Sequence, residues 1–313
     1  MAFRVLELDG GGLKGCILLP QLKILENSLP TGKRIKDVFD LIYGTSTGAI
    51  IGSALAAGAS VDEITELYQK QGAWIFTPKN SWLLPWRKVT RPLYDRERVL
   101  KPLDVLFEKY NVSKAGDLTS KFVGVTVDVC AKPVKINMFL KSWERTDRVL
   151  IDEVAKSFAA AMYFGYYRDD IDKTYYEDGG TGTMNCSLYY SLFECVAKFN
   201  EQLQNGLAIY SFGCGYEENS LTFDEASNYN NINQVKDVLL DGGEGLAHSQ
   251  SAWDQVNALN FLQKNMGKDK LDFRRFDIPI SSKIDVIDGV KYMNQYFDLG
   301  NDYGIQNADR LKI

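Results

Sequence analysis

Ser46 stands at the centre of Gly44-Thr45-Ser46-Thr47-Gly48, a segment with the spacing of a nucleophile elbow. An apolar run at residues 38–43 precedes the segment, and small apolar residues at 49–57 follow it. This order predicts a strand, a sharp turn and a helix. Gly44 and Gly48 suit such a turn because neighbouring backbone must pass close to the serine. The sequence therefore predicts Ser46 as a nucleophile.

A second glycine-rich segment, Asp9-Gly10-Gly11-Gly12-Leu13-Lys14-Gly15, lies between a predicted strand at residues 3–8 and a predicted helix at 17–29. We predict that backbone N–H groups form an oxyanion hole here, namely those of Gly11, Gly12 and Leu13, helped by that of Thr47. The alternative is a dinucleotide loop, since three glycines have the Gly-x-Gly-x-x-Gly spacing: Gly10, Gly12 and Gly15. The next predicted strand ends in a serine rather than a ribose-binding acid, which favours the oxyanion hole.

An activated serine needs a base, and the chain has one histidine, His248. The polar neighbours of this histidine indicate an ordinary solvent-facing position. A carboxylate is the simpler base, and two aspartates precede paired glycines, Asp178 and Asp241. Asp241 follows a predicted amphipathic helix at 235–240, where Gly242 is explained as a helix stop. We therefore predict Asp178 as the general base.

The three segments that begin at Asp9, Gly44 and Asp178 resemble, in this order, the signatures of the patatin-like phospholipases. The resemblance implies an α/β protein with a three-layer patatin-like fold, in which a mostly parallel central sheet is flanked by helices. It also implies a lipid acyl hydrolase of the phospholipase A type with a Ser46/Asp178 dyad and without a metal or cofactor. The positions that support the motifs are Gly10, Lys14, Gly15, Gly44, Gly48, Gly179 and Gly180.

The resemblance extends over residues 3–215 and includes Asn185, the retained residue of an Asn-Asn-Pro motif that the family often has. Beyond it, we expect residues 216–313 to form a largely helical C-terminal part, including residues 273–277. No low-complexity linker divides the chain. We therefore predict a single domain over residues 1–313.

Apolar periodicity predicts further elements along the chain. Helices are expected over residues 61–71, 95–110, 154–164 and 188–204, and strands over residues 121–129 and 134–140. Ser60 followed by Glu63 is typical of a capping box at the start of the first of these helices. Lys14, beside the glycine loop, is expected to stabilise that loop or a lipid phosphate.

Composition restricts the class of protein. The chain has 313 residues, a net charge of -5 and 45% hydrophobic residues, which permits a large core and argues against a nucleic-acid-binding protein. The five cysteines are scattered without metal-ligand spacing. No run approaches the roughly 18 to 20 consecutive apolar residues of a membrane span, and no leader segment is evident. We expect a cytoplasmic protein that associates peripherally with membranes.

Three of the five tryptophans, Trp74, Trp82 and Trp86, lie close together in a segment with two prolines and a basic end. Tryptophan beside Arg and Lys suits a lipid interface. We expect residues 74–91 to form an interfacial lid or docking loop over Ser46 that meets a phospholipid surface. The alternative is that these rings pack on the core of the protein or on a second subunit of a homo-oligomer.

Three other functions stay open at this point. A dinucleotide-binding protein would use the loop from Gly10 to Gly15 to hold its cofactor. A non-catalytic lipid- or nucleotide-binding module would keep the fold without serine reactivity. The family resemblance also includes bacterial immune effectors with this catalytic pattern that cyclic nucleotides switch on, which leaves a cyclic-nucleotide activator open for this chain.

Overall fold

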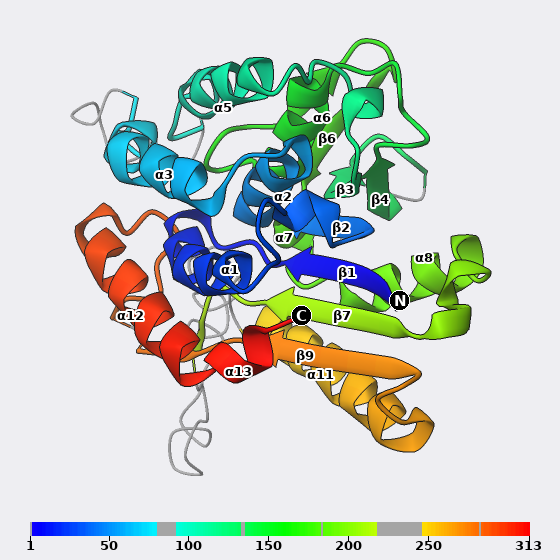
Figure 1. The fold of residues 1–313 in the computed structure, drawn as a ribbon. Helices are drawn as coiled ribbons and strands as arrows, with labels where there is room; N and C mark the ends of the chain where they lie inside the picture. The colour runs from blue at the N-terminus through cyan, green and yellow to red at the C-terminus, as the bar shows by residue number, and fades with distance from the viewer. Residues whose placement is uncertain (1, 80–91, 133–134, 183, 218–245, 282) are drawn as a thin grey trace, which may run out of the picture.

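The computed structural model describes residues 2–79, 92–132, 135–182, 184–217, 246–281 and 283–313. At the centre of the fold is an eight-stranded sheet with the order β5-β6-β3-β2-β1-β7-β9, in which β4 also pairs with β3 (Figure 1). The strands are β1 (Phe3–Leu8), β2 (Leu41–Thr45), β3 (Lys121–Asp128), β4 (Lys135–Lys141), β5 (Tyr167–Asp169), β6 (Thr174–Asp178), β7 (Leu207–Phe212) and β9 (Leu271–Phe276). Two short strands, β8 (Tyr216–Glu217) and β10 (Pro279–Ile280), pair with each other.

Five neighbouring strands, β3, β2, β1, β7 and β9, pair in parallel. Strands β4, β6 and β5 add antiparallel pairs on one side. Parallel strands end at the same edge of a sheet, so the loops that follow β1 and β2 lie next to each other. The predicted α/β class with a mostly parallel sheet is confirmed.

Helices cover both faces of the sheet and so make three layers (Figure 1). One apolar cluster joins Leu6 and Leu8 to α1 (Leu18–Asn27), α2 (Thr47–Ala57), α3 (Val61–Ile75), α5 (Glu97–Lys109), α6 (Leu150–Ser157), α12 (Met293–Gln306) and α13 (Ala308–Leu311). The other joins Phe3 and Val5 to α8 (Leu188–Lys198) and α11 (Leu246–Met266). Successive side chains of a strand point to opposite faces, so β1 contributes to both clusters.

The shorter helical elements connect these layers. They are α7 (Gly179–Gly182), which follows β6 directly, and the 3₁₀ helices η1 (Gly12–Ile17), η2 (Ile35–Asp37), η3 (Ala115–Asp117), η4 (Gln202–Asn205) and η5 (Val290–Tyr292).

The capping box predicted for α3 is confirmed, because the Ser60 hydroxyl accepts the Glu63 N–H while the Glu63 carboxylate accepts the Ser60 N–H. The strands predicted over residues 121–129 and 134–140 are β3 and β4, which pair with each other in antiparallel orientation. The helix predicted over 188–204 is α8 followed by η4.

The helix predicted over residues 154–164 is wrong at its C-terminal end. It corresponds to α6, which ends at Ser157. The Ser157 carbonyl accepts a hydrogen bond from the Ser46 N–H at 3.1 Å instead of continuing the helix. The chain therefore leaves the helix where it contacts the turn that holds the candidate nucleophile.

The helix expected around residues 273–277 is wrong, because residues 271–276 form β9. Leu271 and Phe273 enter one apolar cluster and Phe276 enters the other, which is the alternation of a strand. Strand β9 pairs with β7 and so extends the central sheet. A single domain over the whole chain stays a prediction.

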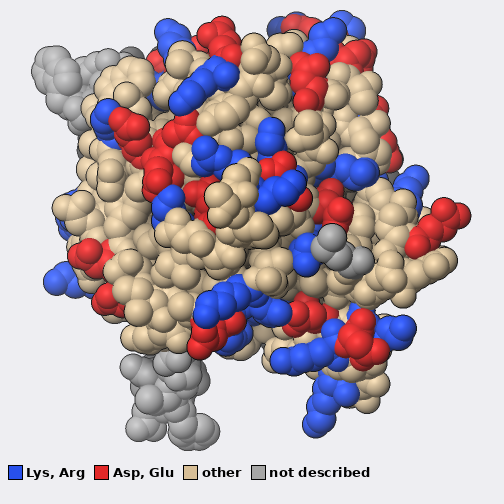
Figure 2. Space-filling view, in the orientation of Figure 1, with Lys and Arg blue, Asp and Glu red and all other residues tan. Residues whose placement is uncertain are grey.

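The described helices include none that is both long enough and apolar enough to cross a bilayer. On the face shown in Figure 2, Lys and Arg side chains are interspersed with Asp and Glu side chains. A continuous basic band is the footprint that phosphate backbones favour. The visible face has a mixed-charge surface instead.

Candidate active site

Ser46 occupies a strained turn between β2 and α2. Its backbone has φ 53° and ψ -120°, a conformation that residues with a side chain rarely adopt and that costs about 1–3 kcal/mol. A Cβ atom on Gly44 would collide with the Gly48 carbonyl, and one on Gly48 would collide with the Leu8 carbonyl. Both glycines are therefore required by close backbone packing, as the elbow motif predicts.

Asp178 ends β6 and lies close to Ser46. Strand register explains the proximity, since Thr45 pairs with Val125 and the next residue of β3, Thr126, pairs with Asp178. The Asp178 side chain is almost completely buried, and its Oδ1 accepts the Gly180 N–H at 2.8 Å. Gly179 has no room for a side chain because an added Cβ would lie 2.7 Å from Val125 Cγ1.

Burial raises the pKa of the Asp178 carboxyl to about 7, although hydrogen bonds from the Ser46 hydroxyl and the Gly180 N–H oppose the shift. The carboxylate thus shares a pocket with the candidate nucleophile and has a proton affinity suited to a base near neutral pH. The structure brings together the two residues that the sequence predicts as a pair.

The glycine loop faces these two side chains. Gly11 and Gly12 have positive φ angles of 157° and 57°, and both line the same pocket as Ser46 and Asp178. In the described part of the chain, the N–H groups of Gly11 and Gly12 have no hydrogen-bond partner. Thr47 is the first residue of α2, so its N–H has no acceptor within the helix. These donors are available to an anion.

A C-terminal segment, residues 284–288, lies against the other end of the glycine loop. The Ile287 carbonyl accepts the Leu13 N–H at 2.7 Å, so Leu13 is not available as the third oxyanion donor that the sequence predicts. The ammonium of buried Lys14 forms an ion pair with Asp285. Lys14 therefore holds the loop to this segment rather than facing a lipid phosphate.

The remaining motif glycines also fill tight positions. A Cβ on Gly10 would lie 3.0 Å from Ser46 Cβ, and one on Gly15 would lie 2.6 Å from Thr47 Oγ1. Asn185 joins the two halves of the site, since its side-chain amide donates to the Gly10 carbonyl at 3.2 Å. The loop and the elbow are thus packed against each other with no space for larger residues.

Two cavities meet at Ser46. The first contains Asp178 and the free amides together with the rings of Phe76, Phe158, Tyr163 and Phe164. The second is almost entirely apolar and is lined mainly by Leu13, Ile50, Leu67, Ile75, Phe76, Val99, Phe158 and Phe164. A polar centre that opens into an apolar cavity suits an ester that carries a long hydrocarbon chain.

Comparison with known proteins agrees with this geometry. The family model "Patatin-like phospholipase" matches residues 6–190. The chain belongs to the patatin-like phospholipase family. Residues 6–190 include the glycine loop, the elbow and Asp178, so the family match and the assembled site involve the same elements.

Among the relatives of this patatin-like chain is the "cGAMP-activated phospholipase" of Vibrio cholerae, 30% identical over 70% of this chain and 66% of the relative. The "cGAMP-activated phospholipase" of Escherichia coli strain TW11681 is 29% identical over 61% of this chain and 55% of the relative. "Phospholipase A I" of Arabidopsis thaliana is 37% identical over 29% of this chain and 7% of its own length. The chain therefore spans between about half and two thirds of the two bacterial relatives.

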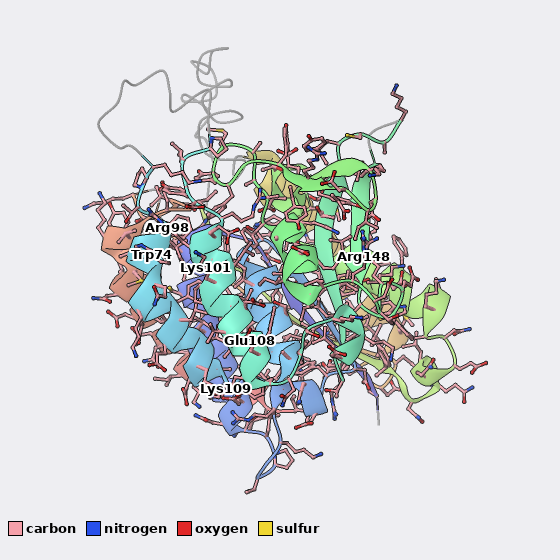
Figure 3. All side chains as sticks on the ribbon, turned by 90° about the horizontal axis from the view of Figure 1, so that it is seen from above. Trp74, Arg98, Lys101, Glu108, Lys109 and Arg148 are labelled. Carbon is pink, nitrogen blue, oxygen red and sulfur yellow. The ribbon has the colours of Figure 1, made fainter. Side chains whose placement is uncertain are left out.

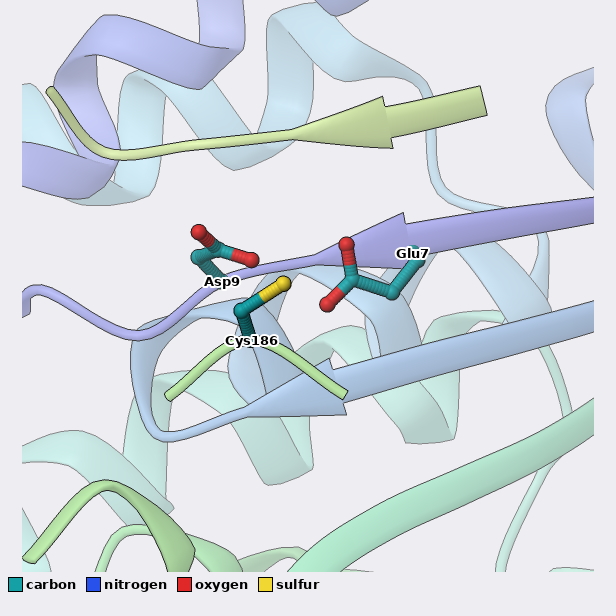
Figure 4. A group of neighbouring side chains, drawn as sticks. All are labelled: Glu7, Asp9 and Cys186. Atoms are coloured by element: carbon teal, nitrogen blue, oxygen red, sulfur yellow. The ribbon is translucent and has the colours of Figure 1, made fainter. Parts of the chain in front are cut away.

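A buried cluster of ionisable groups lies behind the glycine loop of the patatin-like fold. Figure 4 shows the carboxylates of Glu7 and Asp9 and the thiol of Cys186 pointing toward one another. Such a set can ligate a metal, but both carboxylates have protein donors here. Asp9 binds the guanidinium of Arg275, and Glu7 accepts bonds from the N–H of Ser187 at 2.9 Å and from the Ser211 hydroxyl. We assign no metal to this cluster, because its carboxylates already have protein donors, among them the buried guanidinium of Arg275.

Several predicted residues are not brought to this site. Trp74 is 47% exposed at the end of α3, where the Arg98 guanidinium lies 5.3 Å from its ring centroid (Figure 3). The backbone of His248 lies in α11, on the opposite face of the sheet from α2, and its side chain is outside the described structure. The other predicted positions outside the described residues are Trp82, Trp86 and Asp241.

Sequence reasoning missed Arg275, Ile287 and the apolar cavity. Arg275 and Ile287 lie beyond the family match, in the part of the chain expected to be largely helical. The alternation of apolar and polar residues over 271–276 was the available signal for a strand. No local pattern marks Ile287, because its carbonyl meets the glycine loop only in the folded chain.

Proposed function

We propose that this protein hydrolyses fatty-acyl esters of membrane phospholipids, as a phospholipase of the A type. The observation that carries the proposal is that Ser46, buried Asp178 and the glycines with available N–H groups, Gly11 and Gly12, all line one pocket. The apolar cavity beside Ser46 has the character needed for an acyl chain.

In this proposal the Asp178 carboxylate takes the hydroxyl proton while Ser46 Oγ attacks the acyl carbonyl carbon. The N–H groups of Gly11 and Gly12 stabilise the resulting oxyanion. When the tetrahedral intermediate collapses, the ester C–O bond breaks and the leaving alkoxide receives the proton from Asp178. Asp178 then takes a proton from water, which attacks the acyl-enzyme, and the fatty acid leaves as the proton returns to Ser46.

The test is fatty-acid release from mixed phosphatidylcholine and phosphatidylglycerol vesicles. We expect release that requires intact Ser46 and that produces free fatty acid and lysophospholipid in equal amounts. Vesicles with ether-linked chains serve as the control, because they have no acyl ester to cleave. Absence of release under all the conditions described below, together with no reaction of Ser46 with a fluorophosphonate, would contradict the proposal.

The second candidate is a phospholipase that a cyclic nucleotide activates. The names of the Vibrio cholerae and Escherichia coli relatives favour it for this chain. The same vesicle assay, run with and without cGAMP, distinguishes the two. Similar release in both arms would indicate a constitutive enzyme. Release only in the arm with the nucleotide would indicate an activated enzyme. A panel of other cyclic dinucleotides tests whether a different activator is used.

The pKa of Asp178 predicts the pH dependence of hydrolysis. Because the base must be deprotonated and its pKa is raised to about 7, kcat/KM is expected to rise about tenfold per pH unit below pH 7 and to level off above it. A soluble short-chain ester measured from about pH 5.5 to 8 checks this without an interfacial step. A flat profile over this range would contradict the assignment of Asp178 as the base.

We propose that the surface around Trp74 meets the bilayer. Figure 3 shows Trp74, Arg98 and Lys101 close together at one end of α3 and α5, and the next residues after Trp74, Ile75 and Phe76, line the apolar cavity. An exposed indole beside two cations suits the headgroup region of an anionic membrane. The surface thus links the proposed membrane contact to the proposed acyl site.

The substitution Trp74→Ala is expected to weaken partitioning onto anionic vesicles about 5- to 10-fold, because the indole would no longer be buried among headgroups. Sedimentation of protein with vesicles measures it. Trp253→Ala is the matched control, since Trp253 is similarly exposed, at 44%, but lies on α11 on the other face of the sheet. Equal losses in both variants would contradict the proposed surface.

A further inference from the structure

Strand register places three polar side chains in one row behind the glycine loop. Glu7 of β1 pairs with Ser211 of β7, which pairs with Arg275 of β9. The preceding row on the same face is the apolar set Val5, Ile209 and Phe273. On this face of the sheet the side chains therefore change from apolar to polar and charged at the carboxyl ends of the strands, next to the candidate active site.

Arg275 is the centre of this charged row. Its two terminal nitrogens donate to both carboxylate oxygens of Asp9, at 3.1 and 2.5 Å. The same nitrogens also donate to the Ser211 hydroxyl and the Asp277 carboxylate, each at 2.7 Å. The side chains of Arg275 and Asp9 are 11% and 5% exposed. A fork that binds both oxygens fixes the orientation of the carboxylate as well as its charge.

Asp9 is the residue from which the glycine loop begins. Its N–H donates to the Phe212 carbonyl at 3.0 Å, so the backbone of Asp9 is held by β7 and its side chain by β9. Two residues later, Gly11 packs against Cys214, where an added Cβ would lie 2.6 Å from Cys214 Cβ. The loop thus leaves the sheet from a point that Arg275 helps to hold.

The turn around Cys214 is held by the same cluster. The Asp277 carboxylate, which binds Arg275, accepts the Gly215 N–H at 3.0 Å. The Arg275 guanidinium is therefore connected both to Asp9, where the loop begins, and to the turn at Cys214, against which Gly11 packs. The other end of the loop is held independently, through Leu13 and Ile287.

We propose that Arg275 is a positioning residue of the oxyanion hole, which sets the location of the Gly11 and Gly12 N–H groups through its fork on Asp9. The proposal rests on the proposed function, since it assigns Arg275 to the acyl-transfer step at Ser46. It gives the C-terminal strand β9 a part in catalysis, although β9 lies outside the residues that the family model matches.

Arg274 provides a matched control on the same strand. Its side chain lies on the opposite face, where it pairs with Asp272, donates to the carbonyls of Arg310 and Lys312 and stacks on Tyr210. It makes ion-pair and packing contacts like those of Arg275 but none with the glycine loop. Arg274→Met is therefore expected to lower the melting temperature while kcat stays within about twofold of wild type.

Three variants test Arg275. Arg275→Met alone leaves Asp9 buried without its partner and can fail to fold. The double variant Asp9→Asn/Arg275→Met removes the guanidinium together with the Asp9 carboxylate, while Asp277 keeps the N–H groups of Gly215 and Ile278 as donors. We therefore expect it to fold and to lose about 100-fold in kcat, with KM changed less than about threefold. Arg275→Lys keeps the charge without the fork and is expected to lose about tenfold. Melting curves establish folding in each case.

The rate at which Ser46 reacts with a fluorophosphonate is the second readout, because that reaction also develops an oxyanion and should fall in parallel with kcat. Wild-type kcat in any folded Arg275 variant, or failure of all three variants to fold, would overturn the positioning role. If the wild-type protein itself neither hydrolyses ester nor reacts with the fluorophosphonate, the proposed function fails instead. The two failures are thus distinguished by the wild-type result.

Discussion

Ser46→Ala is expected to lower kcat for fatty-acid release by about 10⁴-fold or more, because the acyl group then has no nucleophile on the protein to receive it. Labelling by a fluorophosphonate should disappear completely. Folding should be unaffected or slightly improved, since alanine leaves the elbow backbone with the same strain but removes a polar group from the pocket. Vesicle hydrolysis, covalent labelling and a melting curve measure the three effects.

The matched control for this variant is His248→Ala. A Ser-His-Asp triad would have to use the one histidine of the chain, and the proposed dyad does not need it. We expect His248→Ala to hydrolyse vesicles at close to the wild-type rate. An inactive His248→Ala protein beside an active Asp178→Asn protein would show that the dyad is wrong. Wild-type protein that binds lipid but never reacts at Ser46 would instead favour a non-catalytic module.

Asp178→Asn is expected to reduce kcat by about 10³- to 10⁴-fold, because an amide can keep a hydrogen bond to Ser46 but cannot take its proton. Asp241→Asn is the matched control, since Asp241 also precedes two glycines and was the other candidate from the sequence. We expect Asp241→Asn to keep near-normal activity. The opposite pattern would move the base to Asp241.

The same substitution at Asp178 is expected to stabilise the protein in alkaline solution. The folded-state pKa of Asp178, about 7, is raised above its usual 3.8, so the folded state binds this proton more tightly than the unfolded state does. The contribution of Asp178 to stability is therefore greatest below about pH 4 and is lost as the pH rises to about 7. A neutral amide in place of the buried carboxylate removes that loss.

We expect Asp178→Asn to raise the free energy of unfolding at pH 8 by of order 1–4 kcal/mol, and by less at pH 5. Denaturant unfolding at the two pH values measures it. A variant that is destabilised equally at both would show that the carboxylate is not under the burial penalty that its pKa indicates. Activity lost together with stability gained is the pattern typical of a catalytic group.

The residues that meet at the candidate site were predictable from short stretches of the sequence. Ser46 in its elbow and the paired glycines after Asp178 are short-range patterns, because the backbone itself demands small residues where chains pass closely. Strands followed from apolar runs between turns, whereas the mostly parallel sheet followed from the family resemblance. The helix expected at residues 273–277 is wrong, since residues 271–276 form a strand. That strand depends on pairing with β7, whose residues lie 64 positions earlier in the sequence.

Only the tertiary structure decided which backbone N–H groups are available at the site and which distant residues hold the glycine loop. Leu13 belongs to the glycine motif, yet its N–H is taken by Ile287, and Arg275 reaches Asp9 across 266 residues of sequence. The raised pKa of Asp178 likewise comes from burial, which no motif encodes. A motif specifies which groups a short stretch of chain offers. Hydrogen-bond partners and solvent exclusion depend on distant segments, and these meet only when the sheet and its covering helices have formed.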